Sequence, residues 1–428
     1  MFTVKSPIDK RHLSSKQEEV FLTRLINLCG KENFRPKLDH IRSYLSLDRK
    51  AIEEKSKVII IGGTNGKGET SHCLNALLNS EGLKSCLWTS PHVNSITERF
   101  RYCSSNISIE ELIELLDKYE EDIIRLQLSF YEALFVLFIK YAVSLDIEYL
   151  ILEVGLGGRF DATNIFTKPV AAITSIGLDH TQILGSTLKE ILFEKYGITR
   201  ISGRLFENIE QKFLKDILCN WCDRDSINCT SVSNESETDF QLRNRQMAMA
   251  LFSHITGITN INDDFKWPIT PGRGDHIDFG EFEFTFFGAH NLLGHQKLLQ
   301  SLNDTNKVQY DVLISFSSGR QDQIKSILKL YKTYPCIVKS VNILEFQHER
   351  ALSSAQIKKE LQSETKVYEM HNFLDTILGI NEEIESNKYS ASSTADMPQN
   401  IQLQTRNILV VGSYYFIADM QKYLNIRK

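Results

Sequence analysis

The stretch VIIIGGTNGKGETSHCLNALL, residues 58–78, decides the fold expected for this chain. Four apolar β-forming residues, 58–61, lead into a glycine-rich turn, and a segment with helical spacing follows and ends near Gly82. The pattern predicts a strand, a tight turn and a helix. Glycines let successive backbone N–H groups point at an anion, the helix N-terminus adds positive potential, and Lys67 supplies a full charge. A nucleotide phosphate site is therefore one interpretation of this turn.

The same turn departs from a strict Walker A loop. Ile61 stands where the first glycine of that loop belongs, and Gly68 follows the lysine where serine or threonine belongs. A plain strand-to-helix connection without a ligand therefore remains the alternative interpretation.

The composition indicates an ordinary globular protein with more than one domain. A chain of 428 residues exceeds a single core, and we expect two domains. A net charge of −5 gives no reason to expect nucleic acid or an anionic membrane as a partner. The N-terminal residues contain no apolar run of signal-peptide length, and no window reaches the length of a membrane span, so we expect a cytoplasmic location.

The eight cysteines are scattered along the chain, which fits a reducing compartment. Cys219 and Cys222 form a CxxC pair, and Cys229 is nearby. The pair ends a helical stretch, without a second ligand pair for zinc and without the strand that precedes a redox helix, so we expect it to have no function.

Strands alternate with helices along the chain. Nearly continuous apolar strands are expected at 58–61, 86–89, 149–154 and 169–176, and helices at 18–47, 110–125 and 131–143. This alternation predicts an α/β fold with an N-terminal P-loop-type parallel sheet flanked by helices. The ligand should lie beyond the carboxyl ends of the strands.

The second half of the chain repeats the α/β pattern, so we expect a smaller C-terminal Rossmann-like α/β domain. Its strands are expected near 311–316, 336–344 and 407–411, after a helical region at about 230–267. We place the boundary at the Pro- and Gly-punctuated segment 267–273, giving domains 1–270 and 271–428. The tract 381–406, rich in Ser, Asn, Gln and Glu, is expected to be a surface loop.

Polar residues follow several of the expected strands. Glu153 ends one strand and precedes three glycines in four positions, which makes it a candidate metal ligand; a glycine bulge with Glu153 paired to an arginine is the alternative. Asp179 and His180 follow another strand, and Glu194 and Lys195 come later. A magnesium ion that bridges nucleotide phosphates needs only one or two protein ligands from separate loops.

Taken together, the motifs resemble those of the folylpolyglutamate synthase and dihydrofolate synthase family, relatives of the Mur ligases. The order and spacing match across essentially the whole chain. The matching segments are GTNGKG (63–68), SPH (90–92), EVGLGGRFDATN (153–164), LDH (178–180), EKYGI (194–198), PGR (271–273), GAHN (288–291) and VGS (411–413).

The resemblance implies a ligase that uses ATP and Mg²⁺ to activate a pterin-linked carboxylate and joins it to the amine of L-glutamate. It further implies two ions, of which one is held by Lys195 in carbamylated form. The expected partners are small molecules only: dihydropteroate or reduced folate, L-glutamate and ATP. We expect a monomer that binds neither nucleic acid nor membrane.

The resemblance also assigns residues. The nucleotide would contact Gly66, Lys67, Gly68, Glu69, Asn244 and Arg273. Magnesium would be held by Ser90, Glu153 and His180. The pterin would contact Ser129, Phe130, Tyr131, Glu132, Phe160, Asp161 and Ala162. The catalytic positions would be Lys67, Lys195 and His290, the last near the incoming glutamate.

Two residues depart from the family pattern at nucleotide positions. Glu69 stands where the family has serine or threonine, and Phe287 stands where it has aspartate. A carboxylate ~4 Å from a phosphate charge would cost about 4 kcal/mol at an effective dielectric of 20. Glu69 would be tolerated if it bridged Mg²⁺, stabilised the helix start, or pointed to solvent while Thr70 took the hydroxyl role; we expect the last. Phe287 falls among the polar positions of an alternating strand and cannot accept bonds from a ribose.

Two functional hypotheses follow. The chain is either an active ATP-dependent ligase, or a catalytically weakened family member that binds pterin or folate without ATP turnover.

Overall fold

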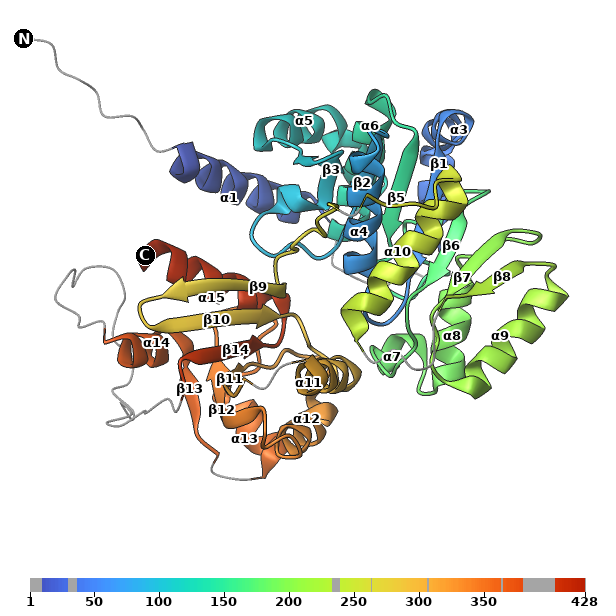
Figure 1. Ribbon diagram of the computed structural model, residues 1–428. Coiled ribbons are helices and arrows are strands. Elements are labelled where there is room, and N and C mark those ends of the chain that lie inside the picture. Colours follow the sequence, from blue (N-terminus) through green and yellow to red (C-terminus); the bar gives the residue numbers. More distant parts are fainter. Residues whose placement is uncertain are drawn as a thin grey trace, which may run out of the picture. The chain divides into compact units, whose positions relative to one another are not determined.

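The computed structural model describes residues 10–29, 37–232, 239–262, 264–305, 308–362, 365–379 and 405–427. The chain divides into two compact units (Figure 1). The first comprises Met1–Gly177, Thr181–Glu235 and Gln241–Pro268, and the second comprises Leu178–His180, Ser236–Phe240 and Ile269–Lys428.

The described part of the first unit contains one sheet of eight strands in the order β4-β3-β2-β5-β1-β6-β7-β8. The strands are β1 Lys57–Gly62, β2 Ser85–Trp88, β3 Phe100–Tyr102, β4 Ser105–Asn106, β5 Tyr149–Glu153, β6 Val170–Ile173, β7 Arg204–Glu207 and β8 Asn228–Ser231. The strands from β2 to β8 in this order run parallel, and β3 and β4 add an antiparallel edge.

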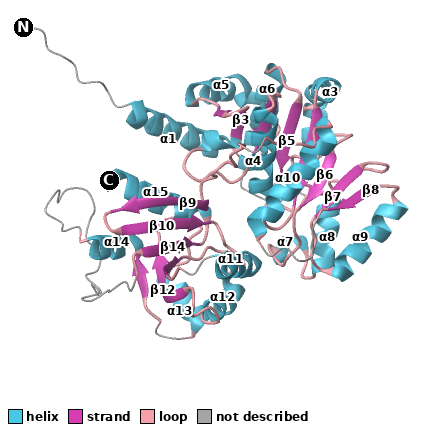
Figure 2. Cartoon of the chain, in the orientation of Figure 1, coloured by secondary structure: helices cyan, strands magenta, loops and turns pink. Residues whose placement is uncertain are grey.

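Helices pack on both faces of this sheet, and Figure 2 shows them in cyan around its magenta strands. They are α1 Lys10–Leu28, α2 Asp39–Tyr44, α3 Ser46–Lys55, α4 Lys67–Ser80, α5 Ile109–Arg125, α6 Phe130–Ser144, α7 Thr181–Leu184, α8 Leu188–Tyr196, α9 Lys212–Arg224 and α10 Phe240–Thr256, with a 3₁₀ turn at Ile96–Arg99. Along β1, Ile60 joins the core formed with α3, α5 and α6, whereas Ile59 and Ile61 join the core formed with α4 and α10. The strand is buried on both faces, which explains its unbroken apolar sequence.

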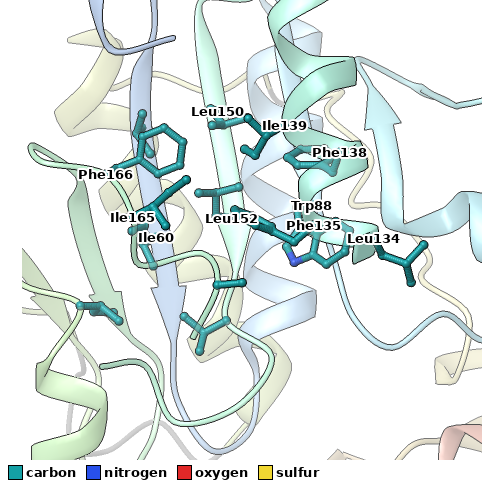
Figure 3. Close-up of a cluster of buried hydrophobic side chains, with 14 of the residues drawn as sticks. Ile60, Trp88, Leu134, Phe135, Phe138, Ile139, Leu150, Leu152, Ile165 and Phe166 are labelled. Atoms are coloured by element: carbon teal, nitrogen blue, oxygen red, sulfur yellow. The ribbon is translucent and has the colours of Figure 1, made fainter. Parts of the chain in front are cut away.

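The larger of the two cores centres on Trp88. Its ring lies 5.6 Å from that of Phe135 and 5.4 Å from that of Phe138, between ring centroids, and both phenylalanines come from α6 (Figure 3). The helix is apolar almost all round because it is buried between the sheet and α5.

The second unit contains a sheet with the strand order β13-β12-β11-β14-β10-β9 in its described part. Its strands are β9 Arg273–Phe279, β10 Phe282–Phe287, β11 Tyr310–Ile314, β12 Val338–Glu345, β13 Val367–Glu369 and β14 Asn407–Val411. Only the β9–β10 pair is antiparallel among these described strands. Its helices are α11 Leu292–Thr305, α12 Ile324–Tyr331, α13 Ser354–Leu361, α14 Met370–Leu378 and α15 Tyr414–Arg427, with a 3₁₀ turn at Gln321–Gln323.

These two sheets confirm the predicted α/β fold class. The helical region expected at 230–267 is confirmed for α10 but wrong at both ends, because Thr230 and Ser231 belong to β8 and the described residues from 257 to 267 are not helical. Polar residues dominate β8, so its sequence carries no strand signal. The surface loop expected at 381–406 lies, except for its last two residues, outside the described residues.

Two further features can be stated for the described part of the chain. No helix there combines the length and apolar character needed to cross a membrane. No disulfide joins the eight cysteines, all of which lie among the described residues, and Cys219 and Cys222 lie in the last two turns of α9, where the end of a helical stretch was predicted.

Candidate functional site

The predicted site residues of the first unit gather at one edge of its sheet. The parallel strands β1, β2, β5 and β6 end there, and the turns that follow them begin at Gly63, Thr89, Val154 and Thr174. The carboxyl edge of a parallel sheet is where such folds bind ligands, so these turns form the candidate site.

The glycine-rich turn after β1 is fixed to the turn after β6. The backbone N–H of Thr64 donates to the carbonyl of Ser175 at 2.9 Å, and the Thr174 hydroxyl donates to the carbonyl of Asn65 at 2.6 Å. Gly63 has φ +146°, and a Cβ there would lie 2.0 Å from the Thr174 hydroxyl oxygen. Only glycine fits this position, because the two turns pack backbone against side chain. Thr174 and Ser175 were not predicted, although two hydroxyl residues directly after a buried strand were a usable signal.

Two lysines converge on this turn. The Lys67 ammonium donates to the carbonyl oxygens of Gly63 at 3.0 Å and Thr64 at 3.2 Å. Lys195 reaches the same Gly63 carbonyl from α8 at 2.9 Å, and only 4% of its surface is exposed. The N-terminus of α4 starts at the same turn, with Gly66 as its N-cap. Two cations and a helix N-terminus together create a strongly anion-attracting site.

The expectation for Glu69 is wrong. Its side chain does not point to solvent but is 7% exposed, and its Oε2 accepts a hydrogen bond of 2.7 Å from Nδ2 of Asn244. Thr70 is fully buried, and its hydroxyl donates to the Asn244 carbonyl at 3.5 Å. The reason is that α10 packs over the first turn of α4, so residues 69 and 70 face a neighbouring helix.

Glu153 and Ser90 meet next to this turn. Glu153 is the last residue of β5 and 3% exposed, and its Oε2 accepts from the backbone N–H of Ser90 at 3.0 Å. A carboxylate beside a hydroxyl residue is an oxygen ligand set of the kind that Mg²⁺ uses together with nucleotide phosphates. No cluster of three or more His, Cys, Asp or Glu side chains suited to a metal occurs within the described ranges.

The predicted pterin-binding segments lie on the same side of the unit. Ser129 caps α6 and forms a reciprocal capping box with Glu132, whose Oε1 lies 3.2 Å from Nε2 of His40. The Tyr131 hydroxyl accepts from Nε1 of Trp88 at 3.4 Å and donates to Asp161 at 3.2 Å. The start of α6 is therefore held rigidly at this edge of the sheet.

Asp161 organises the glycine loop after β5. One of its oxygens accepts from the backbone N–H groups of Gly155 and Leu156, each at 3.0 Å, and the other from the N–H and hydroxyl of Thr163 at 3.0 and 2.6 Å. Burial raises the pKa of Asp161, partly offset by these bonds. Both oxygens are thus engaged by the loop. The two adjacent residues that were also predicted to contact the pterin differ in exposure. Phe160 is half-buried, with the Arg159 guanidinium 4.3 Å from its ring centroid, and Ala162 is buried.

The remaining predicted residues, Arg273, His290 and His180, belong to the second unit. Arg273 lies 5.0 Å from the centroid of the Tyr414 ring. Nδ1 of His290 lies 2.9 Å from the carbonyl of Gly288. The predicted metal set is therefore divided, with Ser90 and Glu153 in the first unit and His180 in the second.

Asp179 and Arg320 form an ion pair in the second unit that was not predicted. Nε of Arg320 donates to Oδ1 of Asp179 at 2.8 Å, and Nη2 lies 2.9 Å from Nε2 of His180. Burial by itself would raise the pKa of Asp179, but the charges of Arg320 and His290 outweigh it and hold that pKa well below its usual value. No sequence pattern indicates this pairing, because its members are 141 residues apart.

Phe287 is half-buried at the end of β10. Its ring centroid lies 6.3 Å from that of Phe240, and it packs against the core formed by α11, α12 and β11. Phe284 and Phe286 are fully buried, as the alternation predicted for this strand requires. Position 287 therefore supports apolar packing, where the family offers a carboxylate.

Comparisons with known proteins agree with this architecture. No family model matches the chain. Over 174 residues it is 37% identical to a dihydrofolate synthase/folylpolyglutamate synthase of Buchnera aphidicola, a match that covers 40% of this chain and 39% of that protein. The sequence match thus spans about two fifths of the relative's length.

Solved structures match over nearly the full chain. A bifunctional folylpolyglutamate synthase/dihydrofolate synthase with Mn, AMPPNP and L-glutamate bound has a TM-score of 0.74 at 21% identity, covering 95% of this chain and 98% of the other. E. coli FolC in complex with DHPP and ADP has a TM-score of 0.75 at 20% identity, covering 96% and 98%. At this identity the likeness establishes the fold.

Fold and site together define a two-domain α/β protein with a phosphate-type glycine-rich turn at the carboxyl edge of its first sheet. Over the matched two fifths of its length the chain is similar to folylpolyglutamate synthases and dihydrofolate synthases, and its fold is that of their solved structures.

Proposed function

We propose that the chain is an ATP-dependent ligase that joins L-glutamate to the carboxylate of dihydropteroate, of a reduced folate, or of both. The observation that carries the proposal is the convergence of Lys67 and Lys195 on the Gly63 carbonyl at the N-terminus of α4. Such an arrangement suits a triphosphate with its metal ions, because Lys67 and the helix N–H groups attract the anion, and a carbamylated Lys195 would hold a metal ion beside it. The relatives whose structures contain AMPPNP with Mn and L-glutamate, or DHPP with ADP, support the choice of substrates.

The reaction would proceed in two steps. The pterin-linked carboxylate attacks the terminal phosphorus of ATP, and ADP leaves. The glutamate amine then attacks the acyl carbon, an amide C–N bond forms and phosphate leaves. Lys67 would neutralise the terminal phosphate, and the segments 129–132 and 160–162 would hold the pterin. His290 would lie near the incoming amine.

Ser90 and Glu153 would hold Mg²⁺, which neutralises phosphate charge, together with His180. A second ion and carbamylation of Lys195 are part of the proposal, as are the monomeric state and the cytoplasmic location. Carbamylation predicts a mass increase of one CO₂ on the tryptic peptide that contains Lys195, lost after acid treatment.

A second candidate function is supported by Phe287. Because this half-buried ring cannot accept bonds from a ribose, it favours a protein that binds pterin or folate with weakened ATP use. The two functions predict different nucleotide behaviour.

The test is glutamate-dependent ADP release with Mg-ATP, using dihydropteroate and tetrahydrofolate in parallel. Turnover with either pterin supports the ligase. Absence of Mg-ATP affinity up to millimolar concentration, with pterin binding retained, would establish the second function instead.

Two matched substitutions test whether the Mg-dependent reaction requires Glu153. Glu153 and Glu207 are both buried carboxylates at the last position of a parallel strand in the same sheet. Glu207 accepts from the backbone N–H of Ile209 at 2.7 Å and is not among the residues predicted to bind nucleotide, metal or pterin. Glu153→Gln should abolish Mg-dependent turnover, whereas Glu207→Gln should retain it.

A further inference from the structure

The bond between Glu69 and Asn244 joins the first turn of α4 to α10. Glu69 is the third residue of α4, a position at which glutamate commonly reaches back toward its own helix N-terminus. Here the carboxylate turns instead to Asn244, and the bond of 2.7 Å from Nδ2 to Oε2 is buried on both sides. The two residues are 175 positions apart, so the contact is a property of the folded unit.

This bond fixes the orientation of the Asn244 side-chain amide. An asparagine amide has a donor end and an acceptor end, and either can face a neutral hydroxyl residue. A carboxylate accepts only, so Nδ2 must face Glu69 and Oδ1 must point elsewhere. In the structure Oδ1 is the Asn244 atom closest to the Gly66 turn, 2.3 Å from where a Cβ on Gly66 would lie. Glu69 therefore presents the acceptor end of Asn244 at the turn that would bind the nucleotide.

We propose that Glu69 is a positioning residue that sets the base preference of the nucleotide site by holding Asn244 with its Oδ1 as acceptor. The proposal rests on the ligase function above and on the nucleotide contact that the resemblance assigns to Asn244, which in that resemblance is a contact with the base. An amide with one fixed acceptor and one remaining N–H complements the amino group of adenine and an adjacent ring nitrogen. Hypoxanthine carries a carbonyl oxygen in place of that amino group, so its acceptor faces the acceptor of Asn244.

The same bond explains why a carboxylate is tolerated so near a phosphate site. The negative charge of Glu69 faces the side-chain amide of Asn244 in α10, and the N–H donor of that amide stabilises the charge in part. Neither serine nor threonine at this position has the length to make the same bond, because in each the hydroxyl oxygen is bonded to Cβ, two atoms nearer the backbone than the Oε atoms of glutamate. The departure from the family pattern thus has a positive role in this chain.

The test compares Mg-ATP with Mg-ITP, whose bases differ in the substituent at C6 and in the hydrogen on the neighbouring N1. We expect the wild-type protein to prefer ATP on the order of tenfold, the discrimination typical of one well-oriented amide pair. In Glu69→Gln the side chain can offer a donor or an acceptor, Asn244 is free to rotate, and the preference should fall several-fold. Asn244→Ala should lose the preference, and Glu69→Gln added to it should change nothing further.

Thr70→Val is the matched control. It removes the hydroxyl that bonds the backbone carbonyl of Asn244, so it loosens the same helix contact without touching the amide. Its ATP-to-ITP ratio should equal that of the wild type even if its melting temperature falls.

Three results would overturn the proposal: an unchanged ratio in Glu69→Gln, an equal fall of the ratio in Thr70→Val, or a further fall when Glu69→Gln is added to Asn244→Ala. A wild-type protein that binds neither nucleotide would instead refute the ligase function, and this inference with it.

Discussion

Replacing Gly66 by alanine should disrupt the nucleotide site because the new Cβ would clash with Asn244. The cost of this clash can be measured separately from the cost of backbone strain. Gly66 has φ +89°, and a left-handed conformation costs a residue with a Cβ about 1–2 kcal/mol. The new Cβ would also lie 2.3 Å from Oδ1 and 3.0 Å from Cγ of Asn244, so that side chain must move. Moving it breaks its bond to the buried Glu69 carboxylate, at a further cost of about 1–3 kcal/mol. The total loss of unfolding free energy should be about 2–5 kcal/mol.

The other end of the same helix offers the control. Gly82 follows α4 with φ +70°, and a Cβ there would meet no atom within 4 Å. Gly82→Ala therefore carries the backbone strain alone, about 1–2 kcal/mol. Urea unfolding of both variants measures the difference, and titration with Mg-ATP should show affinity lost in Gly66→Ala and retained in Gly82→Ala.

Equal destabilisation by the two substitutions would refute this reasoning, because the contact with Asn244 would then contribute nothing. A second check uses the Asn244→Ala background. With the amide gone, Gly66→Ala should cost no more than Gly82→Ala, and a larger cost there would show that the clash lies elsewhere.

Three further predictions concern other parts of the chain. Ser129→Ala and Ser108→Ala each remove the N-cap of a capping box and should cost about 0.5–2 kcal/mol in thermal unfolding, but only Ser129→Ala should also raise the KM for pterin. Asp161→Asn places amide hydrogens against backbone donors of the glycine loop and should cost roughly 3 kcal/mol in urea unfolding, with activity lost; full activity would contradict its organising role. Burial lowers the pKa of His295 to about 3. Because the unfolded chain binds this proton below pH ~6.5, stability present above that pH should fall by up to about 1.4 kcal/mol per pH unit toward pH 4. His295→Gln should lessen the slope by this amount in urea unfolding at several pH values, whereas His276→Gln, at an exposed position on β9, should leave it unchanged.

The elements that could be predicted from the sequence are those with a local cause. The strand, turn and helix at 57–80 follow from an unbroken apolar run, a glycine cluster and helical spacing, each readable within a few residues. The same holds for α6, whose continuous apolar sequence indicates burial on all sides. The short strands at the sheet edges have no such local sequence pattern. For β3, β4 and β8 the neighbouring strand supplies the hydrogen bonds, and the sequence of the edge itself is not apolar enough to show it.

The residues of the candidate site divide in the same way, into those that could be predicted from local sequence and those that could not. Glu153 could be predicted as a buried carboxylate because it ends a buried strand and precedes a run of glycines. The roles of Asp161 and Glu69 could not, since each depends on which donors the fold brings close. Asp161 receives the N–H groups of its own loop and the hydroxyl of Tyr131, 30 residues away, and so organises the loop.

Glu69 shows why a departure from a family motif cannot be interpreted from the motif alone. Considered by its position in α4, its carboxylate had three plausible orientations, and the one expected was the exposed one. The outcome depends on α10, which brings a donor to within 2.7 Å of Oε2. Glu69→Ser would restore the family residue and yet leave Nδ2 of Asn244 without this partner, a cost of about 1–3 kcal/mol for a buried donor. We therefore expect Glu69→Ser to destabilise the first unit and to weaken, not improve, the preference for ATP over ITP. A gain of activity in Glu69→Ser would show instead that the carboxylate opposes the phosphates.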